Sequence, residues 1–160
     1  MTTLSERLAN VSNRFYDRMR HPAAFDAAAR PGTAPDFEGL RGHKYCLLVT
    51  FRADGRPVPT PVWFGLADGR VYVRTEARVA KVKRIRRDPH VRVGPCNQRG
   101  KPKGPLAEGR ARVLASAEEE ERAERALRAN YGLGRRFYED VLGGRIDLVY
   151  LEISPSQGAP

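Results

Sequence analysis

Cysteine is scarce in this 160-residue sequence, which contains only Cys46 and Cys96. The two have no CxxC spacing, and two thiols make neither a disulfide framework nor a structural zinc site. We interpret both as small groups that line the core or a site. The three histidines are isolated from one another and from any cluster of cysteines or carboxylates. This pattern predicts no metal site.

Long hydrophobic runs are also missing. The longest are short stretches such as residues 45–50 and 61–66, whereas a membrane-spanning helix needs about 20 apolar residues. Residues 1–10 alternate polar and apolar types and contain no apolar signal segment. We therefore expect a soluble, cytoplasmic protein without a membrane segment.

Several catalytic motifs are absent. No GxGxxG or GxSxG sequence occurs, which disfavours a dinucleotide-binding domain and a hydrolase with a nucleophile elbow. The nearest approach to a P-loop, residues 94–101, has one residue too many before Gly100. It is followed by Pro102, where a hydroxyl should bind magnesium. A P-loop nucleotide site is therefore not expected.

Acidic residues are in deficit, with 19 Asp and Glu against 29 Lys and Arg, which gives a formal net charge of +10. The excess is concentrated between Lys81 and Arg112, where eleven basic residues face two acidic ones. Such a surface attracts an anionic partner, and nucleic acid, acidic membrane and a phosphorylated cofactor all qualify. The length and the 41% hydrophobic content fit one globular domain over residues 1–160.

Alternating hydrophobic patterns and turn signals predict six strands, at residues 45–52, 57–66, 71–75, 90–96, 107–115 and 145–153. Asp54-Gly55 and Asp68-Gly69 indicate two hairpin turns, so we expect the first three strands to form an antiparallel meander.

Helices are expected at residues 3–20 and 78–87, with a loop at 31–42 between them. Ser116 and Glu119 form a capping box that begins a further helix. We expect Gly132 and Gly134 to interrupt it before a short helix that ends at Leu142. The predicted fold class is mainly β (α+β), a six-stranded antiparallel split β-barrel with peripheral helices. Its parts are an N-terminal helix and loop (1–41), the barrel (42–154) and a tail (155–160).

The second predicted strand carries an unusual proline pattern. Pro57, Pro59 and Pro61 alternate with other residues, which puts every proline on one face and removes alternate backbone donors. We expect an unpaired or bulged stretch here, as is common where a ligand meets the backbone. The candidate cofactor contacts are Thr60, Pro61, Val62 and Trp63.

A second candidate site lies where the predicted strand 71–75 runs into the helix 78–87. Such a junction offers backbone N–H groups and the positive end of the helix dipole. A hydroxyl and cations beside it complete a phosphate cradle, for which the candidates are Arg74, Thr75, Arg78 and Lys81. The alternative is that this basic run is a solvated helix face.

Several segments occur in a fixed order: LVTFRADG at 48–55, PVWF at 61–64, VYVRT at 71–75, then Lys81 and RRDP at 86–89. This ordered set resembles the pyridoxamine-phosphate-oxidase-like flavin and deazaflavin split barrels. Within that superfamily the chain is most similar to the branch that uses the deazaflavin coenzyme F420. The resemblance covers about residues 42–113 and, more loosely, the last strand. It implies an FMN-binding split barrel-like fold and a homodimer with the cofactor groove between subunits.

The resemblance also implies roles for single residues around the phosphate. Thr75 corresponds to the family's phosphate contact, and Lys81 corresponds to its phosphate-binding lysine. A family arginine two residues before that lysine falls on Val79 here, and Arg78 is the nearest substitute.

For the cofactor ring, the resemblance implies that residues 60–63 lie along it with backbone N–H groups facing its polar edge. Trp63 has an alternative interpretation as a core aromatic residue. The glutamine that touches flavin from the partner subunit in the oxidases aligns with Gly104, which argues against oxidation of vitamin B6 compounds.

The leading hypothesis is an F420-dependent oxidoreductase that transfers a hydride between the deazaflavin and a small organic substrate, because a long cationic rim suits the polyglutamate tail. The alternatives are an FMN-binding oxidoreductase of the same fold and a non-catalytic cofactor-binding protein. A basic nucleic-acid-binding module is an alternative of another class, although no exposed aromatic series accompanies the basic segment. Catalytic residues are unassigned, since the spacing does not select a proton donor among Tyr45, Tyr72 and Arg52.

Overall fold

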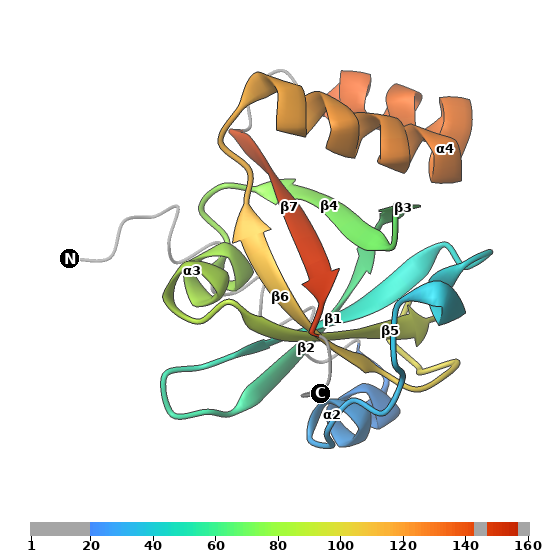
Figure 1. Ribbon diagram of the computed structural model, residues 1–160. Coiled ribbons are helices and arrows are strands. Elements are labelled where there is room, and N and C mark those ends of the chain that lie inside the picture. Colours follow the sequence, from blue (N-terminus) through green and yellow to red (C-terminus); the bar gives the residue numbers. More distant parts are fainter. Residues whose placement is uncertain (1–19, 143–146, 157–160) are drawn as a thin grey trace.

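The computed structural model describes residues 20–142 and 147–156 (Figure 1). Its strands are β1 (Tyr45–Phe51), β2 (Pro57–Trp63), β3 (Gly65–Ala67), β4 (Arg70–Glu76), β5 (His90–Cys96), β6 (Ala107–Val113) and β7 (Leu148–Pro155). Its helices are α2 (Pro22–Ala28), the 3-10 helix η1 (Glu38–Leu40), α3 (Ala80–Arg87) and α4 (Ala117–Leu142). The helix expected at residues 3–20 lies outside the described residues except for its last residue.

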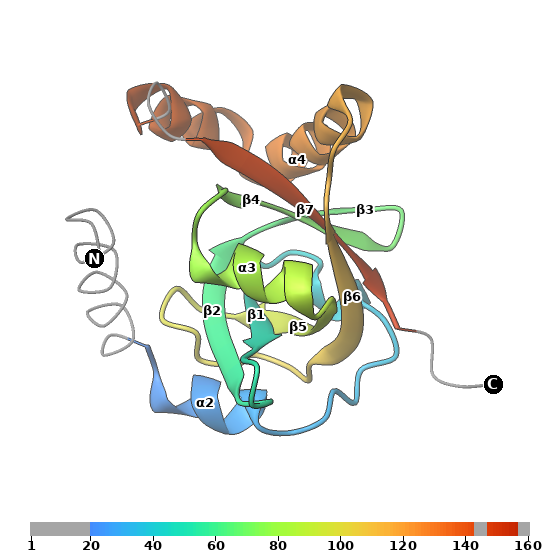
Figure 2. The same cartoon turned by 90° about the vertical axis from the view of Figure 1, so that its left-hand side faces the viewer.

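The seven strands of the described residues form one antiparallel sheet in the order β2-β1-β5-β6-β7-β4-β3. The first and last strands of that order, β2 and β3, are separated in the chain only by Phe64. One extended segment therefore belongs to both ends of the sheet, which curls into a barrel (Figure 2). The mainly β, antiparallel split-barrel architecture is confirmed. Because the strand expected at 57–66 is divided at Phe64, the structure has seven strands rather than six.

Both Asp-Gly turns connect antiparallel strands as expected. Gly55, Asp68 and Gly69 have φ angles of 85°, 53° and 75°, in the left-handed region that tight hairpin turns use. The expected meander is present, but its middle strand is bent and divided in two. The first part, β2, pairs with β1, and the second part, β3, pairs with β4.

Strand β1 is buried on both faces, which explains its continuous hydrophobic sequence. Cys46 and Leu48 belong to the core inside the barrel, together with Ile85 of α3. Leu47 and Val49 belong to a second cluster outside the barrel, against α2. Successive side chains of β1 therefore point alternately into the barrel interior, which α3 covers, and toward its exterior.

Two short helices before β1 were not expected from the sequence. Pro22 begins α2, and the Nδ1 of His21 caps it by accepting a hydrogen bond from the Ala23 N–H at 3.1 Å. The 3-10 helix η1 lies within the segment 31–42 that we expected to be a loop. With seven and three residues, both are too short for a clear helical period.

Helix α4 begins as predicted, with the Glu119 N–H donating to the Ser116 Oγ at 3.2 Å. The expected interruption at Gly132 and Gly134 is wrong, because one helix continues from Ala117 to Leu142. A glycine inside a helix costs about 1 kcal/mol, which does not end a helix that is otherwise stabilised.

The two long helices lie at different places on the barrel (Figures 1 and 2). Helix α3 packs against β1 and β6, whereas α4 lies across β3, β4 and β7. At the β3 contact, a Cβ added to Gly65 would lie 2.4 Å from the carbonyl carbon of Ala126, so only glycine fits. No helix in the described part of the chain is long and apolar enough to cross a membrane.

Candidate functional site

Helix α3 is fixed to β1 by its cationic side chains. The Nε of Arg84 donates to the Thr50 Oγ1 at 2.7 Å, and the guanidinium of Arg87 donates to the Phe51 carbonyl oxygen at 2.5 Å. Lys81, Arg84 and Arg87 follow one another at three-residue spacing, so they lie along the same side of α3. This row of cations lines the contact with β1.

Lys81 is partly buried in the first turn of α3. Burial lowers the pKa of its amine to about 8, and the positive charges of Arg84 and Arg20 act in the same direction. Cys46 and Glu76 oppose this shift, but among the described residues Lys81 makes no ion pair. Lys81 thus lies in a positive environment without an ion-pair partner of its own in the described residues, which suits a bound phosphate or carboxylate.

Lys81 and Val62 are both related to Cys46 of β1. Cys46 is among the groups that influence the pKa of Lys81, and it stands directly opposite Val62 in the β1–β2 ladder. Thr60, two residues earlier in β2, faces the same side of the sheet as Val62. Thr60 and Val62 therefore face the same side of the sheet as Cys46.

The proline face of β2 lies on the other side of the sheet. The ladder between β2 and β1 runs without a bulge, so its hydrogen bonds must use the N–H groups of Val58, Thr60 and Val62, because proline has none. No other strand pairs with β2 in the described residues, so its second edge is open. Within β2, Trp63 is the residue whose N–H points toward that second edge. The ring contact expected from several backbone N–H groups is thus limited to Trp63.

Trp63 packs against α4. Its ring stacks on that of Tyr131, with 4.7 Å between the centroids and an interplanar angle of 18°. The backbone of the adjacent Phe64 is held by the same helix, since its N–H donates to the Tyr131 hydroxyl and its carbonyl accepts from Asn130, both at 2.9 Å. This contact fits the core-packing interpretation of Trp63, and it fixes the bend between β2 and β3.

Arg74 and Thr75 project from opposite faces of β4. Arg74 lies 3.8 Å from the carboxylate of Glu124 and 5.6 Å from the centroid of the Tyr150 ring, so its charge is directed to the α4 side. Thr75 is partly buried on the opposite face, and Arg78 is exposed in the turn that leads to α3. The structure therefore separates Arg74 from the cations of α3.

The basic segment does not form one continuous cationic rim. Arg92 donates to Glu108 and to the Ala28 carbonyl oxygen, each at 2.8 Å. Arg112 donates to Glu119 at 2.8 Å and to Glu152 at 3.0 Å. These two arginines are thus neutralised by carboxylates of the chain. The exposed basic side chains of this segment are Lys83, Arg86, Arg87, Arg99, Lys101, Lys103, Arg110 and the ion-paired Arg112.

The proton-donor candidates differ in accessibility. Tyr72 is 1% exposed and donates to Glu152 at 3.1 Å, and its pKa is raised by burial and by the Glu152 charge. Such a phenol does not reach a substrate, so Tyr72 is removed from the candidates. Tyr45 is partly buried at the start of β1, and Arg52 is exposed beside the first hairpin turn.

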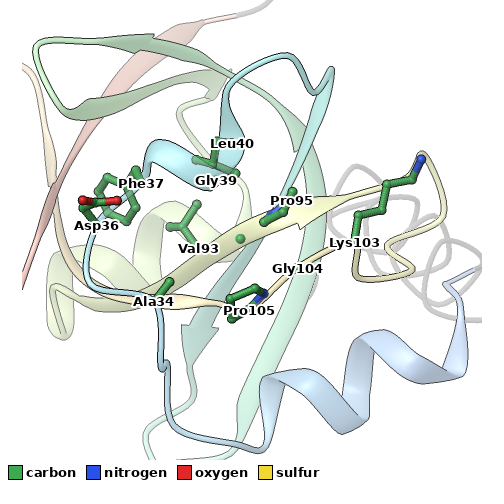
Figure 3. Close-up of a pocket in the computed structure, with 11 residues that line it drawn as sticks. Ala34, Asp36, Phe37, Gly39, Leu40, Val93, Pro95, Lys103, Gly104 and Pro105 are labelled. Carbon is green, nitrogen blue, oxygen red and sulfur yellow. The ribbon is translucent and has the colours of Figure 1, made fainter.

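A hollow of about 220 Å³ lies between the loop that holds η1, strand β5 and the segment before β6 (Figure 3). Its lining is mainly apolar, with Asp36 and Lys103 as charged members. Gly104, the position aligned with the glutamine of the oxidases, lines this hollow. The sequence did not reveal it, because it is built from segments far apart in the chain. Among the described residues no His, Cys, Asp and Glu side chains form a metal-binding group.

Comparisons with known proteins agree with this architecture. The chain is similar to an FAD-binding protein from Mesorhizobium loti at 18% identity and a TM-score of 0.56, covering 75% of this chain and 84% of that one. It is similar to HutZ, the heme storage protein from Vibrio cholerae, at 19% identity and a TM-score of 0.55, with coverages of 76% and 87%. A Clostridium acetobutylicum protein related to general stress protein 26, of the pyridoxinephosphate oxidase family, shares 16% identity at a TM-score of 0.54, with coverages of 74% and 79%.

These structural similarities establish the fold alone, and a search of curated protein sequences found no match. The family is established by a sequence model. The model described as pyridoxamine 5'-phosphate oxidase matches residues 37–158, which is more than half of the chain and includes every strand of the barrel. The chain therefore belongs to the pyridoxamine 5'-phosphate oxidase family.

Proposed function

We propose that this protein is an oxidoreductase that binds a phosphate-bearing coenzyme of the flavin type, and that the coenzyme is the deazaflavin F420. The observation that carries the proposal is the cationic group around Lys81, which has no carboxylate in ion-pair contact with that lysine among the described residues. A phosphate placed there relieves the repulsion between Lys81, Arg84 and Arg20. The residues present therefore fit the anionic end of such a coenzyme.

The proposed contacts follow from this placement. Lys81, Thr75 and Arg78 hold the phosphate, and residues 60–63 of β2 lie along the ring with the Trp63 N–H as the backbone donor. Arg74 is not needed for the phosphate, because Glu124 already receives its charge.

When bound, a coenzyme of this type supplies or accepts a hydride at its ring. The chain contributes binding and orientation: the cations fix the anionic end, and the rigid β1–β2 ladder fixes the position of the ring relative to it. The substrate is a small organic molecule. No side chain acts as a nucleophile in this proposal.

Charge supports F420 over FMN, because the polyglutamate tail of F420 carries more negative charge. Lys83, Arg86 and Arg110 are exposed beyond the phosphate position and make no ion pair within the described part of the chain. Arg92 and Arg112 are paired with carboxylates, so the cationic surface that could receive the tail is smaller than the sequence predicted. FMN, which has no such tail, is therefore kept as the alternative coenzyme. The similarity to an FAD-binding protein likewise keeps a flavin as the alternative coenzyme.

The proposed assembly is a homodimer with the coenzyme groove between subunits, as the resemblance implies. In that arrangement the hollow beside Gly104 faces the coenzyme of the neighbouring subunit, and its small, mainly apolar lining limits the size of the substrate.

The test is a fluorescence titration of the purified protein with F420 and, separately, with FMN. We expect F420 to bind more tightly, and Lys81→Ala to lose about tenfold or more in affinity through the lost charge-assisted contact. Lys101→Ala, which changes an exposed lysine outside α3, is the control and should bind as the parent chain does. Equal affinity of both variants would remove the site assignment.

Two further results separate the alternatives. Protein that purifies with bound FMN and does not respond to F420 would select the flavin. A coenzyme that binds tightly but is not turned over with any substrate in an activity screen would select a coenzyme-binding protein rather than an enzyme.

A further inference from the structure

A second hollow lies on the outside of the barrel, beside the C-terminal end of α2. It has a volume of about 530 Å³ and is bounded by α2 and the segment after it on one side and by the segment before β6 on the other. It shares Gly104 and Pro105 with the hollow beside η1. Sites for small molecules usually have volumes of about 300–1,000 Å³, so its size suits a small ligand.

The two walls of this hollow are held together by hydrogen bonds. The N–H groups of Thr33 and Ala34 donate to the Leu106 carbonyl oxygen at 2.8 and 2.9 Å, and the Gly32 N–H donates to the Glu108 carboxylate at 2.7 Å. The walls approach so closely that a Cβ added to Gly32 would lie 2.8 Å from the Glu108 backbone nitrogen. The hollow is therefore formed before any ligand binds, which lowers the cost of binding.

Most of the lining is apolar, and two of its side chains carry polar groups. Those two are Arg30 and Thr33, both exposed. Their N–H groups are used by the backbone, since that of Arg30 donates to the Ala27 carbonyl oxygen at 3.2 Å. The polar groups left for a ligand on this wall are thus the guanidinium and the hydroxyl. The apolar side chains of the lining are Ala27, Pro31, Pro105 and Leu106.

The guanidinium and the hydroxyl have no partners within the described residues. Arg30 makes no ion pair there, and the Thr33 hydroxyl makes no hydrogen bond. The Glu108 carboxylate does not neutralise Arg30, because it accepts from Arg92 at 2.8 Å and contacts His90 at 2.5 Å. A positive charge and a hydroxyl thus stand beside an apolar surface, and an anion is needed to complement them.

We infer that this hollow is a second binding site and that its ligand is a small apolar carboxylate. The planar guanidinium of Arg30 matches the two oxygens of a carboxylate, and the Thr33 hydroxyl donates a further hydrogen bond to one of them. An aromatic ring or short chain covers Pro31, Pro105 and Leu106, which removes apolar surface from water. A neutral ligand leaves the cation without a partner, so charge and apolar area are recognised together.

The inference does not depend on the proposed function. The proposed coenzyme phosphate lies at α3, whereas this hollow lies beside α2, elsewhere on the barrel (Figure 2). The carboxylate and the coenzyme therefore use different cations, and neither should displace the other from its own site.

The probe is 4-phenylbutyrate, titrated into the full chain and followed by NMR of the backbone amides. We expect saturable shift changes at the Thr33, Ala34 and Leu106 amides. The neutral 4-phenylbutyramide has the same shape and should bind about tenfold more weakly. Arg30→Gln should lose this preference for the acid. Arg125→Gln, which changes an exposed arginine on α4, is the control and should keep it.

Thr33→Val keeps the shape of the side chain and should weaken binding of the acid by about threefold. The dispersion of the amide signals checks that each variant is folded. Shift changes confined to α3, equal affinity for acid and amide, or an unchanged preference in Arg30→Gln would overturn the inference. So would the absence of saturable binding at millimolar concentrations. Binding of the acid here without binding of F420 or FMN supports this site and refutes the proposed function.

Discussion

The α3 and α4 sides of the barrel differ in the partners of their cationic side chains. On the α4 side, three arginines meet carboxylates of the chain: Arg74 and Arg128 approach Glu124, and Arg112 contacts Glu119 and Glu152. Beneath α3, the neighbours of the cations include a hydroxyl, a carbonyl oxygen and a thiol, and within the described part of the chain Lys81 makes no ion pair.

We interpret this difference as one between a structural region on the α4 side and the proposed binding region on the α3 side. The ion pairs on the α4 side hold α4 on β4, β6 and β7. Because these charges are neutralised within the chain, they attract an external ligand only weakly. Beneath α3, burial and the nearby arginines make the charge of Lys81 unfavourable, and in the proposed function an anion from outside relieves this cost. Variants should therefore alter stability most on the α4 side, and ligand binding most on the α3 side.

The largest expected effect on stability is at the contact between β3 and α4. Gly65→Ala places a methyl group 2.4 Å from the Ala126 carbonyl carbon, so the helix must shift, at a cost of about 3 kcal/mol. Denaturant unfolding measures this loss. Gly39→Ala is the matched control, because a Cβ there has nothing within 4 Å and should leave the midpoint unchanged. Equal midpoints for both variants would contradict the close packing of α4.

Breaking the charge network beneath α4 should have the next largest effect. Glu152 is 4% exposed and accepts from Tyr72 at 3.1 Å and from Arg112 at 3.0 Å. Glu152→Gln weakens both contacts and should lower the free energy of unfolding by about 2 kcal/mol. The exposed Glu118 provides the control Glu118→Gln. Unfolding curves that coincide for the two variants would show that the network does not stabilise α4.

On the α3 side, removing the charge should stabilise the protein. The folded-state pKa of Lys81, about 8, is below its ordinary value of 10.5, so the unfolded chain binds more protons between these pH values. Stability should therefore rise with pH across this window, and the cost of the charge is fully present below it. Lys81→Met should raise the unfolding free energy at pH 7 on the order of 1 kcal/mol.

The measurement for Lys81→Met is denaturant unfolding at pH 7 and pH 10, with and without coenzyme. The gain should shrink at the higher pH, and coenzyme should stabilise the parent chain but not the variant. A variant less stable than the parent at pH 7 would mean that Lys81 has a stabilising partner, and the contrast between the two sides would fail.

The smallest expected effect is at the start of α4. Ser116→Ala removes the acceptor of the Glu119 N–H and should cost about 0.5–1 kcal/mol. Because α4 is also held by side-chain contacts of Ala123, Ala126, Asn130 and Tyr131, its helical circular dichroism should persist. A loss of most helical signal would mean that the cap, and not the packing on the sheet, stabilises this helix.

The sequence predicts much of the barrel because its signals are local. The Asp-Gly turns and the alternating strands each depend on a few neighbouring residues, and β5 has the predicted bounds His90–Cys96. The bend at Phe64 was not predictable, since it depends on Asn130 and Tyr131, more than 60 positions away in the chain.

In the candidate site, too, local sequence patterns select some residues, whereas their partners come from elements distant in the chain. Lys81 and Thr75 stay predictions, and the structure adds Arg84 as a neighbour that the sequence pattern did not select. Arg74 was selected because it stands next to Thr75, but alternation along β4 directs it to Glu124 instead. Partners of this kind come from distant elements, so spacing along one strand does not reveal them.

The central claim is that the cations beneath α3 receive the anionic end of a coenzyme. The most direct measurement is the pKa of the Lys81 amine, followed by NMR of the lysine side chains in the free protein and with F420 or FMN added. We predict a pKa of about 8 in the free protein that rises toward its ordinary value of 10.5 when the coenzyme binds. A pKa that does not change while the coenzyme is bound would place the anion elsewhere and contradict the claim.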